Sequence, residues 1–160
     1  MPEICEFNYD SPLGNLTITC SDAGCERIAF ASRTEERGSF NKSAEAIKCW
    51  LDEYFAGNKP RSSIPPLCLK GTEFQKKVWE QLLAIPYGET TIYSRISEAL
   101  TGKKNSSRAV GGAIGANPVA IIIPCHRVLA KNGLGGYAWG VGIKEKLLAF
   151  EKKDKTRNKL

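Results

Sequence analysis

The amino-acid sequence predicts an α+β protein, with a small N-terminal antiparallel sheet and helix followed by a mostly helical C-terminal domain that contains a helix-turn-helix. Three observations support this fold class. β-branched and aromatic residues form three short runs before residue 33, and apolar residues recur near a 3.6-residue period in several later segments. Residues 58–67, rich in proline and serine, interrupt these patterns. We therefore expect a linker there and two domains, residues 1–69 and residues 70–160.

Three N-terminal segments rich in β-branched and aromatic residues predict strands that pair as an antiparallel meander. They are residues 3–9, 16–21 and 25–32. The aspartate, proline and glycine of residues 10–15 indicate a turn between the first two. Residues 43–57 then predict a helix that begins at a Ser43 cap and ends at Gly57. Its apolar face is expected from Ile47, Leu51, Tyr54 and Phe55.

The C-terminal domain begins with a well-marked helix over residues 71–88. It opens with a capping box, in which Gln75 follows Thr72 by three positions, and it ends at Pro86. Its buried stripe is expected from Phe74, Val78, Leu82 and Leu83.

Two shorter helices are expected next, over residues 90–102 and 103–118. Gly102 would end the first, Ser106 would cap the second, and Pro118 would stop it. Two short helices joined by a glycine-containing turn are the outline of a helix-turn-helix.

The remaining segments predict one more strand and one more helix. Residues 119–123 (VAIII) are strand-like, residues 132–142 form a glycine-rich loop, and residues 143–153 form a final amphipathic helix.

Charge is distributed unevenly along the chain. Residues 1–69 carry a net charge of −3, and residues 70–160 carry +9, so the whole chain has +6. A basic C-terminal part favours an acidic partner, with nucleic acid as the first candidate. The longest apolar run, residues 119–123, is too short to cross a bilayer, and the acidic N-terminus does not resemble a secretory signal. We therefore expect a cytoplasmic protein that does not act in a membrane.

Six cysteines raise the question of disulfides or a metal. We expect reduced thiols, because the chain shows no export signal. A zinc site built from Cys5, Cys20 and Cys25 is one interpretation, but no C-x-x-C pair exists and the one histidine is distant. Buried apolar thiols are the favoured alternative, and we predict no metal site.

The segment RAVGGAIGAN is expected to be helical, yet it contains three glycines. Each costs about 1 kcal/mol relative to alanine in a helix interior. Small residues along one side allow another backbone to approach closely, either a neighbouring helix or DNA. Arg108 at the start of this helix favours DNA. Because the helix has almost no long polar side chains, we expect little sequence specificity and binding in the minor groove.

The sequence IIIPCHRV places Cys125 beside His126, the only histidine of the chain. A cysteine is a good nucleophile only as a thiolate, which a nearby cation favours. Adjacent residues in a strand point to opposite faces, so contact between the two needs a turn at Pro124 or a bridging water. A histidine base also needs an orienting acid, for which Glu145 and Glu151 are candidates. A buried cysteine beside a surface histidine is the alternative.

From about residue 70 to 151, the chain resembles the methylated-DNA–protein-cysteine methyltransferases, also called O6-alkylguanine-DNA alkyltransferases. The matching segments occur in the family's order and spacing: FQKKVWEQLLAIPYGETTIYSRIS, SRAVGGAIGANP, IIIPCHRV and GGYAWGVGIKEKLLAFE. The first 70 residues match in size and strand pattern only. The resemblance implies a DNA repair protein that binds duplex DNA carrying O6-alkylguanine through the minor groove and flips the damaged base. It would transfer the alkyl group irreversibly to its own cysteine, once, as a monomer without a cofactor, in the cytoplasm or, in a eukaryote, the nucleus.

Carried over residue by residue, the resemblance makes Cys125 the alkyl acceptor and His126 a base that acts through a water. Glu151 would orient His126. Tyr93 would donate a hydrogen bond to the leaving guanine, and Asn117 would tie the second helix of the helix-turn-helix to the active-site turn.

The resemblance also assigns DNA contacts and a substrate pocket. Arg108 would fill the gap left by the flipped base. Further DNA contacts are expected from Ser94, Ser107, Ala109, Gly112 and Lys131. The pocket is expected to be lined by Val128, Tyr137, Ala138 and Trp139, with the carbonyls of Cys125 and Val128 accepting from the guanine amino group.

Two departures from the family and two other functions bear on this interpretation. Many relatives have Ser-Gly where this chain has Ala138 and Trp139, so only the Ala138 backbone N–H would remain to hold O6, and Trp139 would narrow the pocket or stack on the base.

A non-catalytic lesion-binding module is one alternative function, against which the presence of Cys125 argues. A thiol hydrolase is the other, and it leaves Arg108 and the basic half unexplained.

Overall fold

The structure, a computed structural model, describes residues 3–57, 59–103 and 107–157. It divides into two compact units. One comprises Met1–Lys70 with Pro118–Ala120, and the other comprises Gly71–Asn117 with Ile121–Leu160. The antiparallel sheet near the N-terminus and the mostly helical remainder confirm the α+β fold class. Within the described ranges, we find no helix with the length and apolar character needed to span a membrane.

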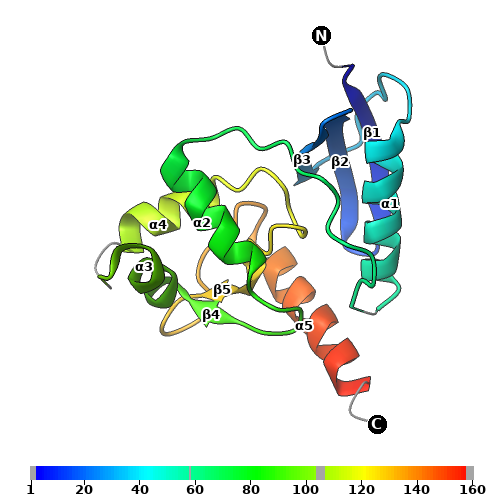
Figure 1. The fold of residues 1–160 in the computed structure, drawn as a ribbon. Helices are drawn as coiled ribbons and strands as arrows, with labels where there is room; N and C mark the ends of the chain where they lie inside the picture. The colour runs from blue at the N-terminus through cyan, green and yellow to red at the C-terminus, as the bar shows by residue number, and fades with distance from the viewer. Residues whose placement is uncertain (1–2, 58, 104–106, 158–160) are drawn as a thin grey trace. The chain divides into compact units, whose positions relative to one another are not determined.

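The first unit contains a three-stranded antiparallel sheet in the order β1 (Cys5–Ser11), β2 (Gly14–Ser21) and β3 (Gly24–Phe30) (Figure 1). All three predicted strands are present. The turn between the first two is tighter than expected, since only residues 12–13 separate them. Alternate side chains of β2 enter the core, as the two-residue period of a strand requires.

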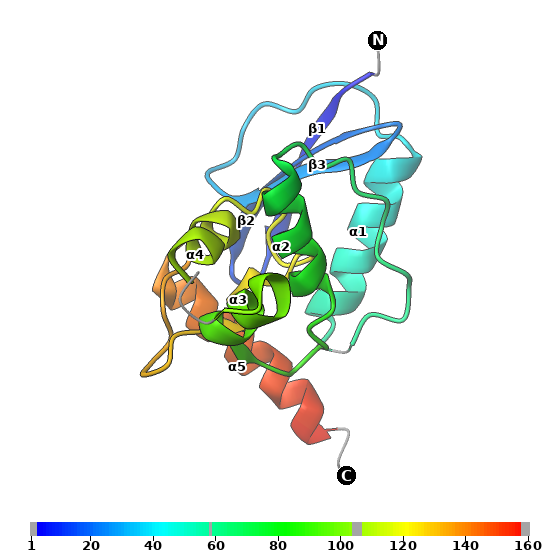
Figure 2. The same ribbon diagram turned by 60° about the vertical axis from the view of Figure 1, so that its left-hand side comes forward.

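One helix, α1 (Lys42–Phe55), packs against this sheet (Figures 1 and 2). Its cap is Asn41, whose side-chain oxygen accepts from the Ala44 N–H at 2.9 Å. The prediction of Ser43 as the cap is therefore wrong, because Ser43 already lies in the first turn.

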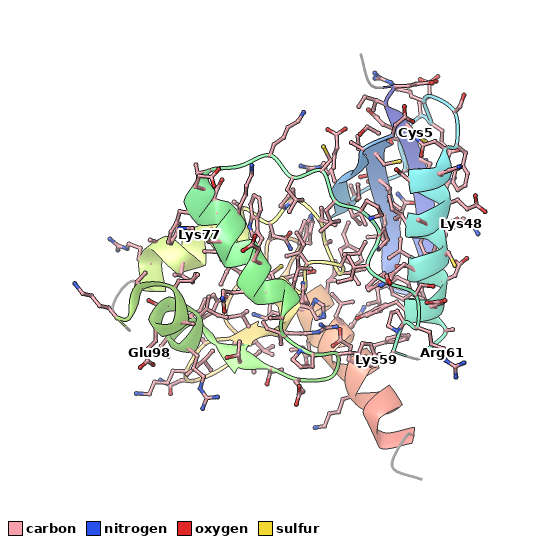
Figure 3. The ribbon with its side chains drawn as sticks, in the orientation of Figure 1. Cys5, Lys48, Lys59, Arg61, Lys77 and Glu98 are labelled. Atoms are coloured by element: carbon pink, nitrogen blue, oxygen red, sulfur yellow. The ribbon has the colours of Figure 1, made fainter. Side chains whose placement is uncertain are left out.

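The apolar face of α1 faces the sheet. The predicted residues with no exposed surface are Ile47, Leu51 and Tyr54. Each such burial stabilises the fold by about 1.5–3 kcal/mol relative to an exposed side chain. On the opposite face, Lys48 projects away from the sheet (Figure 3).

The second unit begins with α2 (Glu73–Leu83) and its predicted capping box, in which Thr72 and Gln75 bond each other's backbone N–H. Val78 and Leu82 are buried as expected, but the prediction for Phe74 is wrong, because its side chain is 37% exposed. Phe74 lies in the first turn of the helix, where it faces away from the core.

Trp79 also belongs to the buried face of α2, although the sequence pattern did not predict it there. It is buried, and its ring nitrogen donates to the carbonyl of Ala113 at 2.9 Å. This bond joins α2 to α4 (Ser107–Gly115).

The helix-turn-helix consists of α3 (Tyr93–Thr101) and α4, which lie side by side in Figure 2 and contact each other. Gly102 ends α3 in the left-handed conformation, with φ 74°, as predicted. The predicted Ser106 cap lies outside the described residues. Helix α3 begins three residues later than expected, because β4 (Thr91–Ile92) pairs in parallel with β5 (Val128–Leu129).

The apolar run 119–123 is not a strand, contrary to the prediction. Only Val119 makes an isolated bridge, to Ile28 of β3 in the first unit, and a turn follows. The glycine-rich loop precedes α5 (Val141–Arg157), which is longer at both ends than the predicted residues 143–153.

Candidate active site

A strained turn positions the PCHRV segment. Ile121 has φ 71°, and among the described residues it is the only non-glycine with positive φ. This conformation is unfavourable for a β-branched residue, by about 1–3 kcal/mol. Burial holds the turn in place, since Ile121 and Ile123 have no exposed surface. Asn117 adds a bond from its side-chain nitrogen to the Ile123 carbonyl, at 2.9 Å.

The turn delivers Cys125 to the start of a short 3-10 helix, η2 (Cys125–Arg127). The thiol is buried, with 3% of the residue exposed. Burial raises the pKa of Cys125 to about 11, while the Asn117 side chain, 3.2 Å from Sγ, and the charge of Lys144 act in the opposite direction. The resting sulfur is therefore a protonated thiol at neutral pH, and a base is needed to activate it.

The helical turn of η2 also sends His126 into the interior, where it meets α5. His126 is fully buried, and its Nε2 lies 2.5 Å from a carboxylate oxygen of Glu151. Arg127 binds the same carboxylate through Nε at 2.8 Å and Nη2 at 3.2 Å, and its Nη1 donates to the Ile85 carbonyl. Gly88 N–H donates the fourth bond to Glu151, at 3.0 Å. After Pro124 the chain therefore forms the 3-10 turn η2, and the alternative of a surface histidine is wrong, because His126 is buried.

These contacts fix the protonation states. Burial alone would raise the pKa of Glu151, but the hydrogen bond from His126 and the charge of Arg127 outweigh it and hold that pKa below its ordinary value. Burial lowers the pKa of His126, despite the opposing effect of Glu151. A neutral imidazole that donates from Nε2 to a carboxylate leaves Nδ1 as an acceptor. That Nδ1 is buried and has no hydrogen-bond partner among the residues that the structure describes, so it can accept a proton.

A pocket of about 250 Å³ opens beside the thiol. It is lined by Tyr93, Gly111, Ile114, Gly115, Cys125, Gly136, Tyr137 and Ala138. Two of the four predicted pocket residues, Tyr137 and Ala138, line it, and within the described part of the chain the buried Tyr137 hydroxyl has no hydrogen-bond partner. Val128 is not among the lining residues; it is buried, and its carbonyl accepts from Lys144. Trp139 is not among the lining residues, and its ring packs edge-on against Tyr137 with centroids 5.2 Å apart.

The loop that carries Tyr137 approaches Tyr93 closely at Gly135. Gly135 has φ 74°, and a Cβ there would lie 3.0 Å from the Tyr93 ring. The Tyr93 hydroxyl donates to the Gly136 carbonyl at 3.5 Å. Glycine is thus required at residue 135 for both its conformation and its small size.

The predicted DNA-contact residues lie on or near the helix-turn-helix. Arg108, Ala109 and Gly112 are exposed on α4, Ser94 is half-buried near the start of α3, and Lys131 is exposed in the loop after β5. Ser107 begins α4, but its side chain lies outside those described. Side chains added at Gly111, Gly112 or Gly115 would meet nothing within 4 Å. Packing within the described structure therefore does not require these glycines.

Sequence reasoning missed two buried cations at the site. Arg127 received no role of its own from the sequence, whereas in the structure its guanidinium binds the Glu151 carboxylate. It did not single out Lys144, which is fully buried. A signal was available, because Lys144 precedes the buried Leu147 by three residues and so shares the apolar face of α5.

Comparisons with known proteins agree with this geometry. The model of the 6-O-methylguanine DNA methyltransferase DNA-binding domain matches residues 73–153, and that of the ribonuclease-like domain of the same methyltransferase matches residues 5–67. A probable methylated-DNA–protein-cysteine methyltransferase of Acanthamoeba polyphaga mimivirus is 53% identical over 104 residues, which cover 65% of this chain and 69% of the relative.

Two further relatives cover almost the whole chain. A methylated-DNA–protein-cysteine methyltransferase of Saccharolobus solfataricus is 39% identical over 143 residues, or 89% of this chain and 92% of the relative. The crystal structure of Mycobacterium tuberculosis OGT in complex with DNA superposes with a TM-score of 0.81 at 36% identity, covering 93% of each chain. These matches show that the chain, with its buried Cys125 and His126 and its pocket, belongs to the methylated-DNA–protein-cysteine methyltransferase family.

Proposed function

We propose that this protein repairs DNA by transferring the alkyl group of O6-alkylguanine to Cys125, irreversibly and once per molecule. The observation that carries the proposal is a buried thiol that lines the pocket and is followed in the chain by His126, whose Nε2 meets the carboxylate of Glu151 and whose Nδ1 has no hydrogen-bond partner among the described residues. A thiol with a pKa of about 11 needs such a base. A water between Nδ1 and Sγ would carry the proton.

The proposed reaction balances without a cofactor. The Cys125 proton passes through the water to His126, a bond forms between sulfur and the alkyl carbon, and the bond from that carbon to O6 breaks. Its electrons stay on the guanine, which takes up one proton in place of the one that left the thiol. Tyr93 would donate a hydrogen bond to the leaving base and so stabilise its developing negative charge. Reversal would require the neutral guanine, a weak nucleophile, to displace a thiolate from a stable thioether, so the transfer is irreversible.

We also propose that the helix-turn-helix binds duplex DNA through the minor groove and that the damaged base flips into the pocket. The glycines of α4 have open space around them, which allows a DNA backbone to approach closely. Exposed Arg108 would occupy the gap in the stack. The net charge of +9 after residue 69 favours a polyanion, and the Mycobacterium tuberculosis relative was crystallised with DNA.

The proposed division of labour assigns DNA binding and alkyl transfer to residues 70–160 and a structural role to residues 1–69. We propose that the protein acts as a monomer. All six cysteines are free. A reducing compartment would keep Cys125 available, so we place the protein in the cytoplasm, or in the nucleus of a eukaryote.

An intact-mass experiment tests the function. The protein is mixed with excess duplex oligonucleotide that carries one O6-methylguanine, weighed, and mapped by peptide mass. We expect one added methyl group, on Cys125, with saturation at one per protein. The Cys125→Ala variant should bind the lesion but gain no mass, and Cys49→Ala, at an exposed cysteine, should react like the wild type. Tight binding without any mass change would replace this proposal with a lesion sensor.

A further inference from the structure

The hydroxyl of Tyr137 is a buried polar group that has no role in the reaction above. Tyr137 lines the pocket together with Cys125. Within the described part of the chain, its hydroxyl has no hydrogen-bond partner, and the same holds for Nδ1 of His126. Buried polar atoms in native proteins nearly always bond to protein or to ordered water, so both atoms call for a partner.

Neighbouring contacts hold Tyr137 in the pocket wall. Its carbonyl accepts from the Gly140 N–H at 3.0 Å, and the ring of Trp139 packs edge-on against its ring. The preceding carbonyl, that of Gly136, accepts from the ammonium group of Lys144 at 3.0 Å. The loop is thus fixed on both sides of residue 137, which leaves the hydroxyl little freedom to turn toward another partner.

The electrostatics place this hydroxyl close to the thiol and to the histidine. Burial raises the pKa of Tyr137, and the negative charges of Cys125, as a thiolate, and of Glu151 raise it further. Such charge effects weaken as the distance grows, so both groups lie near the hydroxyl. The same two residues flank His126, because Cys125 precedes it in η2 and a carboxylate oxygen of Glu151 lies 2.5 Å from its Nε2.

One water molecule would satisfy all of these groups. A buried water makes about three hydrogen bonds to polar groups that otherwise have no partner. Here it would accept from the Cys125 thiol, donate one hydrogen to Nδ1 of His126, and donate the other to the Tyr137 hydroxyl. Without that hydroxyl, the water would keep two partners and would be held less firmly between Sγ and Nδ1.

We propose that Tyr137 is a positioning residue whose hydroxyl holds the water that carries the proton from Cys125 to His126. This inference rests on the proposed function, because the water belongs to the same reaction. The proton balance does not change. The thiol donates to the water, the water donates to Nδ1, and the hydroxyl keeps its own proton.

The alternative is that Tyr137 acts only as a wall against the flipped base. The two roles differ in a reaction that needs no nucleic acid, the alkylation of Cys125 by iodoacetamide. Because the thiol has a pKa of about 11, its proton must also be removed in that reaction at pH 7.5. Loss of the water would therefore slow this reaction, whereas loss of a contact to the base would not.

The test compares the wild type with Y137F, H126A and the variant that carries both changes. Two rates are measured at pH 7.5, namely single-turnover methyl transfer from duplex DNA with one O6-methylguanine and iodoacetamide alkylation, followed by the mass of the Cys125 peptide. Affinity for the same DNA is measured by fluorescence anisotropy. The matched control is Y54F, which removes the hydroxyl of a fully buried tyrosine in α1.

We expect Y137F to slow both reactions by about tenfold, a part of the factor of about 100 or more that a general base contributes, with DNA affinity unchanged. In the H126A background the same change should have no further effect, because the water then has no base to serve. Y54F should match the wild type. If Y137F does not fold, as judged by circular dichroism, Y137M takes its place, since methionine adapts to irregular space and brings no hydroxyl.

Three results would overturn the role of Tyr137. They are unchanged rates in Y137F, a loss confined to methyl transfer, and a loss of the same size with and without His126. The proposed function fails separately, if the wild type reacts with iodoacetamide in the expected way but transfers no methyl group.

Discussion

Replacing Glu151 by glutamine should damage stability and reactivity together, because this carboxylate serves both. It accepts four hydrogen bonds, from Nε2 of His126, from Nε and Nη2 of Arg127, and from the Gly88 N–H. A glutamine of the same shape offers one acceptor oxygen and an NH₂ group that must face other donors. It also leaves the guanidinium of Arg127 buried without a counter-charge.

The size of the effect follows from that burial. Removing one partner of a buried ion pair is unfavourable by about 3–5 kcal/mol. For a chain of this length, about 1 kcal/mol shifts the melting temperature by about 2–4 °C, so E151Q should melt roughly 6–20 °C lower. With His126 no longer fixed by an anion, alkyl transfer should slow by about 100-fold, within the range that one general base contributes. DNA affinity should stay close to that of the wild type.

Thermal unfolding by circular dichroism and single-turnover transfer from O6-methylguanine DNA measure the two effects, at a temperature where the variant is folded. The matched control is Glu145→Gln, at an exposed position of the same helix, which should change neither quantity. The reasoning would be refuted if E151Q reacted at the wild-type rate and melted within about 2 °C of the wild type, a shift that corresponds to a stability change of about 1 kcal/mol at most.

Three further perturbations probe other parts of the site. Arg108→Ala should weaken repair of duplex DNA far more than reaction with free O6-benzylguanine, and equal losses in the two assays would remove Arg108 from the gap left by the flipped base. Gly135→Ala should destabilise the protein by about 1–2 kcal/mol in urea unfolding, because its φ is positive and its Cβ would press on the Tyr93 ring, whereas Gly112→Ala should stabilise the protein by up to about 1 kcal/mol and weaken DNA binding. Stability should fall as pH drops below about 6.5, the ordinary pKa of histidine, because burial lowers the pKa of His126 and the unfolded chain then binds more protons. A urea midpoint that is the same at pH 7.5 and pH 5.5 would contradict that last expectation.

Local chemistry made much of the fold predictable. The capping box of Thr72 and Gln75 and the left-handed Gly102 depend on residues within three positions of the helix end, so the sequence alone identifies them. The prediction of Ser43 as the helix cap was wrong because Asn41, two residues earlier, is an equally good hydrogen-bond acceptor and is the residue that caps α1.

Elements that depend on distant partners were not predictable. The run of β-branched residues 119–123 has high strand propensity, yet burial and the side chain of Asn117 hold it as a turn with Ile121 in the left-handed region. The two-residue strands β4 and β5 are too short to show a period. Lys144 was missed because the sequence does not show that the carbonyls of Val128 and Gly136 accept hydrogen bonds from its ammonium group.

The burial of Cys125 has a consequence for selectivity. If Cys125 acts only once, as proposed, each reaction with an electrophile in solution would inactivate one molecule. Burial raises the pKa of Cys125, so its sulfur is mostly a protonated thiol at neutral pH and is a poor nucleophile toward alkylating agents in solution. Cys49, by contrast, is exposed and meets such agents first. Under the proposed function, burial would therefore protect Cys125 from side reactions before a damaged base binds.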